Sequence, residues 1–312
     1  MASRTGRVRS GRRARRWNEP VMRINRWLPW LYAAPMIVFV AAIFAYPIVT
    51  LFRYSLEVPG AANEPPSTGL ANFEYVFTDP LFHTALLNNL ELFLCVPVMI
   101  ALSVILSAIL FDRPKGWKIY RTLLFVPYIL SIPTVGFVFG YIFQYQGVLN
   151  TGLKLIGLKF LALDWLGSPT WAMRTIMLVI IWKELGFGII LCLARLVSVS
   201  EEYFESARVD GARWWQILWH VTIPQLAPAL AFYGIIELIN MLSWVFAYVY
   251  VMTLGGPMNS TVVTEYYIYQ QVFTNDIVGV GSAAGVVLLG IVAVLIAMRV
   301  RLQRRLALSG YE

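Results

Sequence analysis

Long apolar stretches alternate with short polar ones along most of the chain. Each apolar stretch approaches the roughly 20 residues that a helix needs to cross a lipid bilayer. We predict spans at 29–52, 86–111, 122–145, 172–194, 229–253 and 279–300. The pattern therefore predicts an all-α integral membrane protein with six transmembrane helices.

Prolines interrupt three of these predicted spans. They are Pro35, Pro47, Pro97, Pro127 and Pro133. Neighbouring helices and water lining a cavity make such breaks tolerable in a membrane, because they satisfy the carbonyls that proline frees. We expect kinked spans around a cavity; the alternative is kinks that only help the helices to pack.

The segment 198–228 is polar where its surroundings are apolar. Ser198, with Glu201 three residues later, predicts a capping box that starts a helix. Tyr203, Phe204 and Ala207 give that helix an apolar face, opposite one that carries acidic residues and Arg208.

The dipeptide Asp210-Gly211 breaks this helix, since glycine adopts the backbone angles of a sharp turn. A second amphipathic helix is expected to run to Ile223 and to stop at Pro224. We call the two predicted helices and their turn the elbow, and we expect it to lie outside the bilayer.

Two other interpretations of the elbow are open. Its tryptophans suit an ordinary loop at the membrane interface, and its turn is similar to a DNA-reading helix-turn-helix. Between residues 195 and 228, three arginines (Arg195, Arg208 and Arg213) stand against four acidic residues. Attraction to DNA phosphates would therefore be weak, and we expect no nucleic-acid partner.

The fifth predicted span carries a polar and aromatic stripe. At 100° per residue its members fall on one side of a helix: Tyr233, Glu237, Asn240, Trp244 and Tyr248. Such groups inside a membrane face protein or water. Aromatic faces and carboxylate or amide groups are what a sugar needs, so we expect the stripe to line a substrate pathway. The alternative is an interface with a second membrane subunit.

Further polar residues lie on neighbouring spans. Lys183 and Glu184 are adjacent, so we expect them to point about 100° apart and not to face one another. Asn88 and Asn89 are weaker candidates for the cavity wall.

Composition agrees with the membrane assignment. Hydrophobic residues make up 59% of the chain and charged residues 13%, against about 25% charged in soluble domains. The two cysteines, Cys95 and Cys192, lie in apolar runs and indicate packing.

The placement of the basic residues predicts the topology. Twenty lie in 1–28, 112–121, 195–228 and after 298, whereas three lie in the opposite loops. Both termini and the elbow are therefore expected in the cytoplasm. We divide the chain into a basic cytoplasmic tail at 1–28, a transmembrane domain at 29–300 and a second cytoplasmic tail at 301–312. The first apolar run is too long for a secretory signal, and we expect it to be retained.

The sequence contains no nucleotide-cradling motif G-x-x-x-x-G-K-[ST]. Hydrolase and zinc-protease motifs are also missing, and there are two histidines. We therefore predict no catalytic, cofactor-binding or metal-binding residue, and any ATP hydrolysis would belong to another chain.

The elbow resembles the EAA loop of type I ABC importer permeases. That loop reads roughly E-A-A-x-x-D-G-A, followed by an apolar pattern and proline. Ser206 replaces the usual Ala and Leu218 the commoner Phe. The resemblance implies a coupling helix that contacts an ATPase subunit through Glu205, Ala207, Asp210, Gly211, Ala212, Leu218 and Pro224.

Other motifs are similar to the first permease of the carbohydrate-uptake (maltose/glycerol-3-phosphate-type) branch. They are Tyr46-Pro47, the G-L-x-N-[FY] of residues 69–73, Trp182-Lys183 with Gly186-Phe187, and the pattern from Thr253 to Phe273. This resemblance covers about residues 30–300.

It implies a permease fold, a second homologous permease, two ATPase subunits that bind ATP and Mg, an external substrate-binding protein, and a place in the bacterial cytoplasmic membrane. A di- or oligosaccharide is the expected substrate, with glycerol phosphate or another small solute as the alternative. An ion-coupled transporter and a membrane anchor for an ATPase are the competing functions outside this class.

Overall fold

The computed structural model describes residues 27–58 and 67–309. Residues 1–26 of the predicted basic tail and 310–312 of the second tail lie outside this part. The chain forms two compact units, Met1–Val49 and Thr50–Glu312.

The first predicted span is one long helix. It consists of α1 (Leu28–Val40), a π-helical turn η1 (Ala41–Ala45) and α2 (Tyr46–Leu56). Residues Pro29–Leu56 are long and apolar enough to cross a membrane. The π-helical turn ends two residues before Pro47, whose missing N–H interrupts the regular helical pattern.

The second unit continues with short elements and the second span. Strand β1 (Glu57–Val58) pairs antiparallel with β2 (Ser67–Thr68), and α3 (Ala71–Thr78) follows. Helices α4 (Pro80–Leu92) and α5 (Cys95–Phe111) together form a candidate span. The carboxylate of Asp79 starts α4 by accepting a hydrogen bond from the N–H of Leu81 at 2.8 Å.

The third predicted span is not a single helix. Helices α6 (Trp117–Ile129) and α7 (Ile132–Ile142) meet at an angle of 100°. Ser131 begins α7, where its hydroxyl accepts from Thr134 N–H, and Pro133 occupies the first turn. A serine cap followed by proline is a helix start, so the kink expected in the 122–145 span is a full break between two helices.

The fourth span and the elbow follow. After α8 (Val148–Leu155) and the short 3₁₀ turn η2 (Lys159–Leu161), α9 (Pro169–Val197) is a candidate span. The elbow contains α10 (Glu202–Val209) and α11 (Trp214–Ile217). A π-helical turn η3 (Leu218–Thr222) joins α11 to α12 (Ile223–Ser243).

Two predictions for the elbow were wrong. Ser198 is the C-cap residue of α9, where its hydroxyl donates a hydrogen bond to the carbonyl of Arg195. Helix α10 starts without a side-chain cap. Pro224 does not end a helix, because Trp214–Ser243 is one helix. Proline is accommodated there because the preceding π-helical turn already shifts the hydrogen-bond pattern.

The fifth predicted span breaks before its predicted end. Helix α12 stops at Ser243 and α13 (Phe246–Met252) begins after Trp244 and Val245. The carboxylate of Glu265 accepts from the N–H of Phe246 at 2.7 Å and so caps α13. Glu265 belongs to α14 (Thr264–Tyr269), which continues through η4 (Gln270–Thr274) to the last candidate span in α15 (Val278–Ser309).

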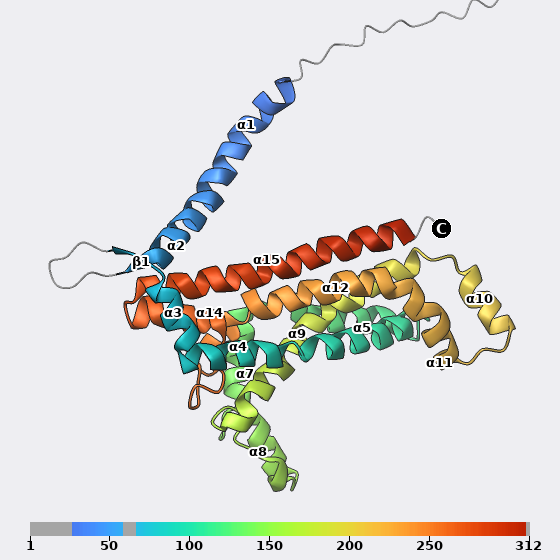
Figure 1. Cartoon of the computed structure of the whole chain (residues 1–312). Coiled ribbons are helices and arrows are strands. Elements are labelled where there is room, and N and C mark those ends of the chain that lie inside the picture. Colours follow the sequence, from blue (N-terminus) through green and yellow to red (C-terminus); the bar gives the residue numbers. More distant parts are fainter. Residues whose placement is uncertain (1–26, 59–66, 310–312) are drawn as a thin grey trace, which may run out of the picture. The chain divides into compact units, whose positions relative to one another are not determined.

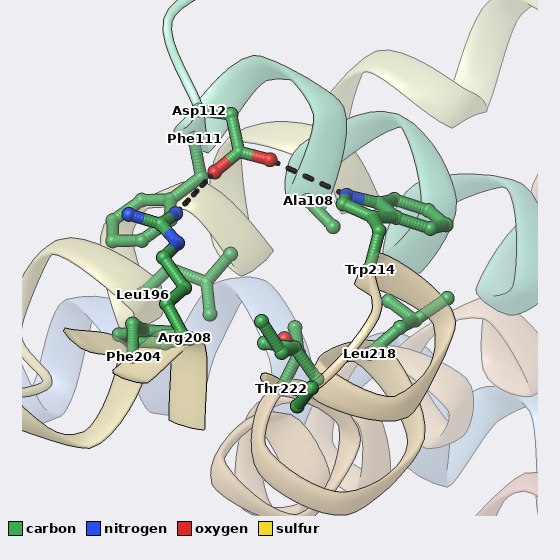
Figure 2. Close-up of a pocket in the computed structure, with 11 residues that line it drawn as sticks. Ala108, Phe111, Asp112, Leu196, Phe204, Arg208, Trp214, Leu218 and Thr222 are labelled. Atoms are coloured by element: carbon green, nitrogen blue, oxygen red, sulfur yellow. Dashed lines mark hydrogen bonds and ion pairs between the residues drawn. The ribbon is translucent and has the colours of Figure 1, made fainter. Parts of the chain in front are cut away.

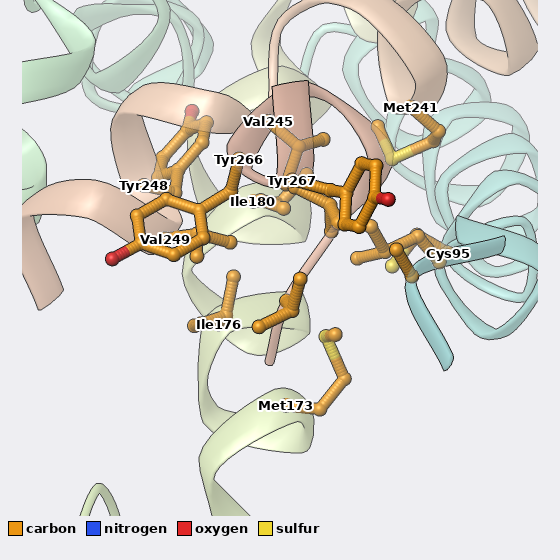
Figure 3. Close-up of a cluster of buried hydrophobic side chains, with 14 of the residues drawn as sticks. Cys95, Met173, Ile176, Ile180, Met241, Val245, Tyr248, Val249, Tyr266 and Tyr267 are labelled. Atoms are coloured by element: carbon orange, nitrogen blue, oxygen red, sulfur yellow. The ribbon is translucent and has the colours of Figure 1, made fainter. Parts of the chain in front are cut away.

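Buried side chains from α4, α5, α9 and α12–α14 form the main core (Figure 3). In the second unit, α5 and α12 pack along α9, and α15 packs along α12 (Figure 1). We expected Asn88 and Asn89 at the cavity wall, but both are buried in this core. Asn89 donates to the carbonyl of Met241 and accepts from Thr264, because the end of α12 and the start of α14 leave these backbone groups free.

Candidate functional site

The turn of the elbow is a glycine-terminated helix end. Gly211 has φ +78°, a left-handed conformation that side chains other than glycine rarely adopt. Its N–H donates to the carbonyl of Arg208, and the N–H of Ala212 donates to the carbonyl of Ala207, both at 3.0 Å. These two bonds make a Schellman motif. The motif explains why Ala207, Asp210-Gly211 and Ala212 stand at these positions relative to one another.

Asp112, at the end of α5, bonds to both arms of the elbow. One carboxylate oxygen accepts from the guanidinium of Arg208 at 2.8 Å, and the other accepts from the indole N–H of Trp214 at 3.3 Å. Figure 2 shows the carboxylate between these two side chains. Sequence reasoning missed Asp112; its signal was an acidic residue in an otherwise basic turn, 112–121.

Apolar contacts hold the elbow to the ends of α5 and α9. Phe204 is buried with its ring 5.1 Å from that of Phe111, and Leu218 is buried in the same cluster. Among the other residues implied for ATPase coupling, Ala207 and Ala212 are half-buried. Those exposed are Glu205, Asp210, Gly211 and Pro224. The elbow therefore has an anchored inner face and a free outer face.

A cavity of about 450 Å³ lies among α6, α7, α9, α12 and α13. Asn240, Trp244 and Tyr248 of the predicted stripe line it, together with Tyr128, Ile132, Ile180, Lys183, Glu184, Phe187, Ile236, Met241 and Val245. Tyr233 and Glu237 are buried and do not belong to this lining. The break after Ser243 separates the stripe into two helices, so its members are not one helical face.

Lys183 and Glu184 form an ion pair in the cavity wall. The Lys183 ammonium lies 3.0 Å from a carboxylate oxygen of Glu184, although we expected them not to face one another. Their long side chains bend toward each other because unpaired charges are costly inside a membrane. Lys183 also donates to the carbonyl of Tyr128 at 3.4 Å, near the break between α6 and α7.

The buried tyrosines connect α9 to the fifth span. Tyr248 donates to the carboxylate of Glu184 at 3.2 Å, and Tyr233 donates to its carbonyl at 3.5 Å. One oxygen of Glu237 accepts from Asn240 at 3.4 Å, whereas its other oxygen has no hydrogen-bond partner within the described part of the chain. The network joins the two broken spans through α9.

Comparisons with known proteins agree with this architecture. Residues 1–308 match the model of the family described as binding-protein-dependent transport system inner membrane component. The chain is 33% identical over 248 residues to the lactose transport system permease protein LacF of Rhizobium radiobacter, which covers 78% of this chain and 83% of the relative.

Two further matches extend over nearly the whole chain. A probable ABC transporter permease of Bacillus subtilis, YurN, is 31% identical over 285 residues, or 89% of this chain and 96% of the relative. A crystal structure of a bacterial alginate ABC transporter in complex with an alginate pentasaccharide-bound periplasmic protein contains a chain with 26% identity and a TM-score of 0.77. The alignment covers 90% of this chain and 95% of the solved one. The protein is therefore a multi-pass inner-membrane component of the binding-protein-dependent transport family.

Proposed function

We propose that this chain is the permease subunit of an ABC importer that carries a sugar across the bacterial inner membrane. The observation that carries the proposal is the elbow, whose Schellman turn presents an exposed outer face while apolar side chains anchor its inner face. An element built in this way suits docking to another subunit. Relatives that include a lactose permease support a sugar as the substrate.

The proposed assembly contains a second homologous permease, two ATPase subunits and an external substrate-binding protein. The ATPases bind ATP and Mg²⁺ and contact the elbow through Glu205, Asp210 and neighbouring residues, whereas this chain has no catalytic role and holds no cofactor. Both termini face the cytoplasm, supported by the distribution of basic residues. The solved relative in complex with a periplasmic protein supports the external partner.

The proposed sugar site is the cavity at α9, α12 and α13. Trp244 is 65% exposed and offers a flat aromatic face, and Asn240 offers an amide for sugar hydroxyls. The charged residues among the described lining are Lys183 and Glu184, which neutralise one another. An anionic substrate would have to break this pair, so the cavity favours an uncharged saccharide over glycerol phosphate.

Isolation of the complete importer tests the assembly. A tag on this chain should recover an ATPase and a second permease from native membranes. Proteoliposomes made from that complex should take up a neutral disaccharide only when ATP and the binding protein are present. Uptake by this chain alone, driven by an ion gradient, would support the competing class of transporter.

Substitution in the cavity tests the sugar site. Asn240→Ala and Trp244→Ala should lower uptake while the subunits still assemble. Phe160→Ala changes an exposed aromatic residue outside the cavity lining and serves as the control. Normal uptake by both cavity variants would show that the stripe is not the site. The uptake of a uronate-containing disaccharide can be compared with that of a matched neutral one, both bound by the external protein. Preferred uptake of the uronate would contradict the proposal that the substrate is uncharged.

A further inference from the structure

Asp112 is placed by α5 and not by the elbow. Asp112 is the C-cap residue of α5. The next residue, Arg113, has φ +50° and turns the chain away from the helix axis. The N–H of Asp112 donates to the carbonyl of Ala108 at 3.4 Å, and that of Arg113 donates to the carbonyl of Leu110 at 3.1 Å. The carboxylate therefore moves with the second span.

The two arms of the elbow reach this carboxylate from opposite sides of the Gly211 turn. Arg208 belongs to the last turn of α10, and Trp214 is the first residue of α11. Each arm supplies one donor and each carboxylate oxygen receives one (Figure 2). The angle between the arms is thus tied to the end of α5 at a single residue.

These contacts set the geometry more than they hold the elbow in place. The Arg208 and Asp112 side chains are 56% and 39% exposed, and exposed ion pairs contribute little to stability. Attachment comes instead from buried Phe204 and Leu218. Loss of Asp112 should leave the elbow attached but free to change its angle. Arg208 could then turn toward Glu201 and Glu205, which line a small surface pocket together with Arg208 and Asp112.

We infer that Asp112 is a positioning residue that couples the elbow to the second span. Movement imposed on α10 and α11 by a partner passes through the carboxylate into α5, in addition to passing directly into α12. The inference rests on the proposed docking of an ATPase at the elbow. It assigns a role to the turn after α5, which the sequence marked only as basic.

The test compares coupling with assembly in the complete importer, purified through a tag on this chain. Asp112→Ala should lower the sugar taken up per ATP hydrolysed by about fivefold or more, within the range reported for coupling mutations, with normal recovery of the ATPase. Trp214→Phe keeps an aromatic ring, although a smaller one, but removes the N–H donor and should cause a smaller loss. Lys115→Gln, in the same turn but outside these contacts, should behave as the wild type.

A reversed pair separates positioning from folding. Asp112→Arg combined with Arg208→Asp restores the ion pair and should recover part of the coupling that either single change removes. Unchanged uptake per ATP in Asp112→Ala would overturn the inference. So would a loss explained entirely by reduced assembly. If the complex contains no ATPase, the proposed function fails first, and the two failures are therefore distinguishable.

Discussion

The ion pair of the elbow is exposed, whereas the ion pair of the cavity is enclosed. Arg208 and Asp112 keep 56% and 39% of their side-chain surface exposed, but Lys183 and Glu184 keep 6% and 12%. Water weakens the first pair, while the second has no such screening. The exposed pair can therefore be broken at little cost, whereas removal of one partner of the enclosed pair leaves a buried charge without compensation.

The largest expected effect comes from breaking the cavity pair. Glu184→Leu leaves Lys183 charged without its partner and should destabilise the protein by about 3–5 kcal/mol. Thermal unfolding of the purified complex measures the loss. The double variant Lys183→Met with Glu184→Leu removes both charges and should recover most of the stability. Equal melting temperatures for the single and double variants would contradict a required pair.

Close packing beside the cavity gives the next effect. A Cβ at Gly188 would collide with the hydroxyl of Ser103 and lie 2.6 Å from the Tyr233 ring. Gly188→Ala should therefore cost about 1–3 kcal/mol, again measured by thermal unfolding. Gly140→Ala is the matched control, since a Cβ there meets no atom within 4 Å. A Gly188→Ala protein as stable as the control would show that α9 and α12 are not in close contact.

The elbow should respond in function more than in stability. At Gly211 a Cβ meets nothing within 4 Å, so the cost of substitution lies in its φ of +78°. Gly211→Val should cost about 1–2 kcal/mol locally and should lower sugar-stimulated ATPase activity. Asn tolerates left-handed angles, so Gly211→Asn should retain more activity than the valine variant. Equal activity of the two variants would argue against this account of the turn.

The smallest effect is a pH dependence near α13. Glu265 lies between the last two candidate spans, and burial raises its pKa from 4.5 to about 7. The folded protein therefore binds a proton more tightly than the unfolded chain, so stability should fall as pH rises across that interval. The melting temperature of the wild type should therefore fall as the pH rises from 4.5 to about 7. Glu265→Gln should flatten this dependence, whereas Glu74→Gln on the surface should not.

The sequence predicted the membrane class, the spans and the turn at Gly211 because these depend on local patterns. Apolar length identifies a span, and a glycine three residues after Arg208 predicts a helix end. It failed where one local signal had two readings. Pro133 could kink a helix or start one, and Ser198 could begin a helix or end the preceding one. In the structure the hydroxyl of Ser131 caps the helix that contains Pro133, and the hydroxyl of Ser198 bonds back to the carbonyl of Arg195.

The candidate sites show the same limit. Glu205 to Ala212 could be found as one continuous motif, but Asp112 is 96 residues from Arg208 and only the fold brings them together. The stripe assumed an unbroken helix, whereas the cap on α13 comes from Glu265, 19 residues beyond Phe246. Spacing likewise suggested that Lys183 and Glu184 diverge, because it describes Cβ directions and not the reach of long side chains.

The helix that begins in the elbow is longer than a membrane span requires. Trp214–Ser243 is a single 30-residue helix, which at 1.5 Å per residue is about 45 Å long. That exceeds the roughly 30 Å thickness of the hydrocarbon layer. Asn240 lies in the last turn of this helix and Trp244 directly follows its end, so a tilt of the helix at the elbow would move both residues. A movement of the elbow would in this way change the shape of the cavity that we propose as the sugar site.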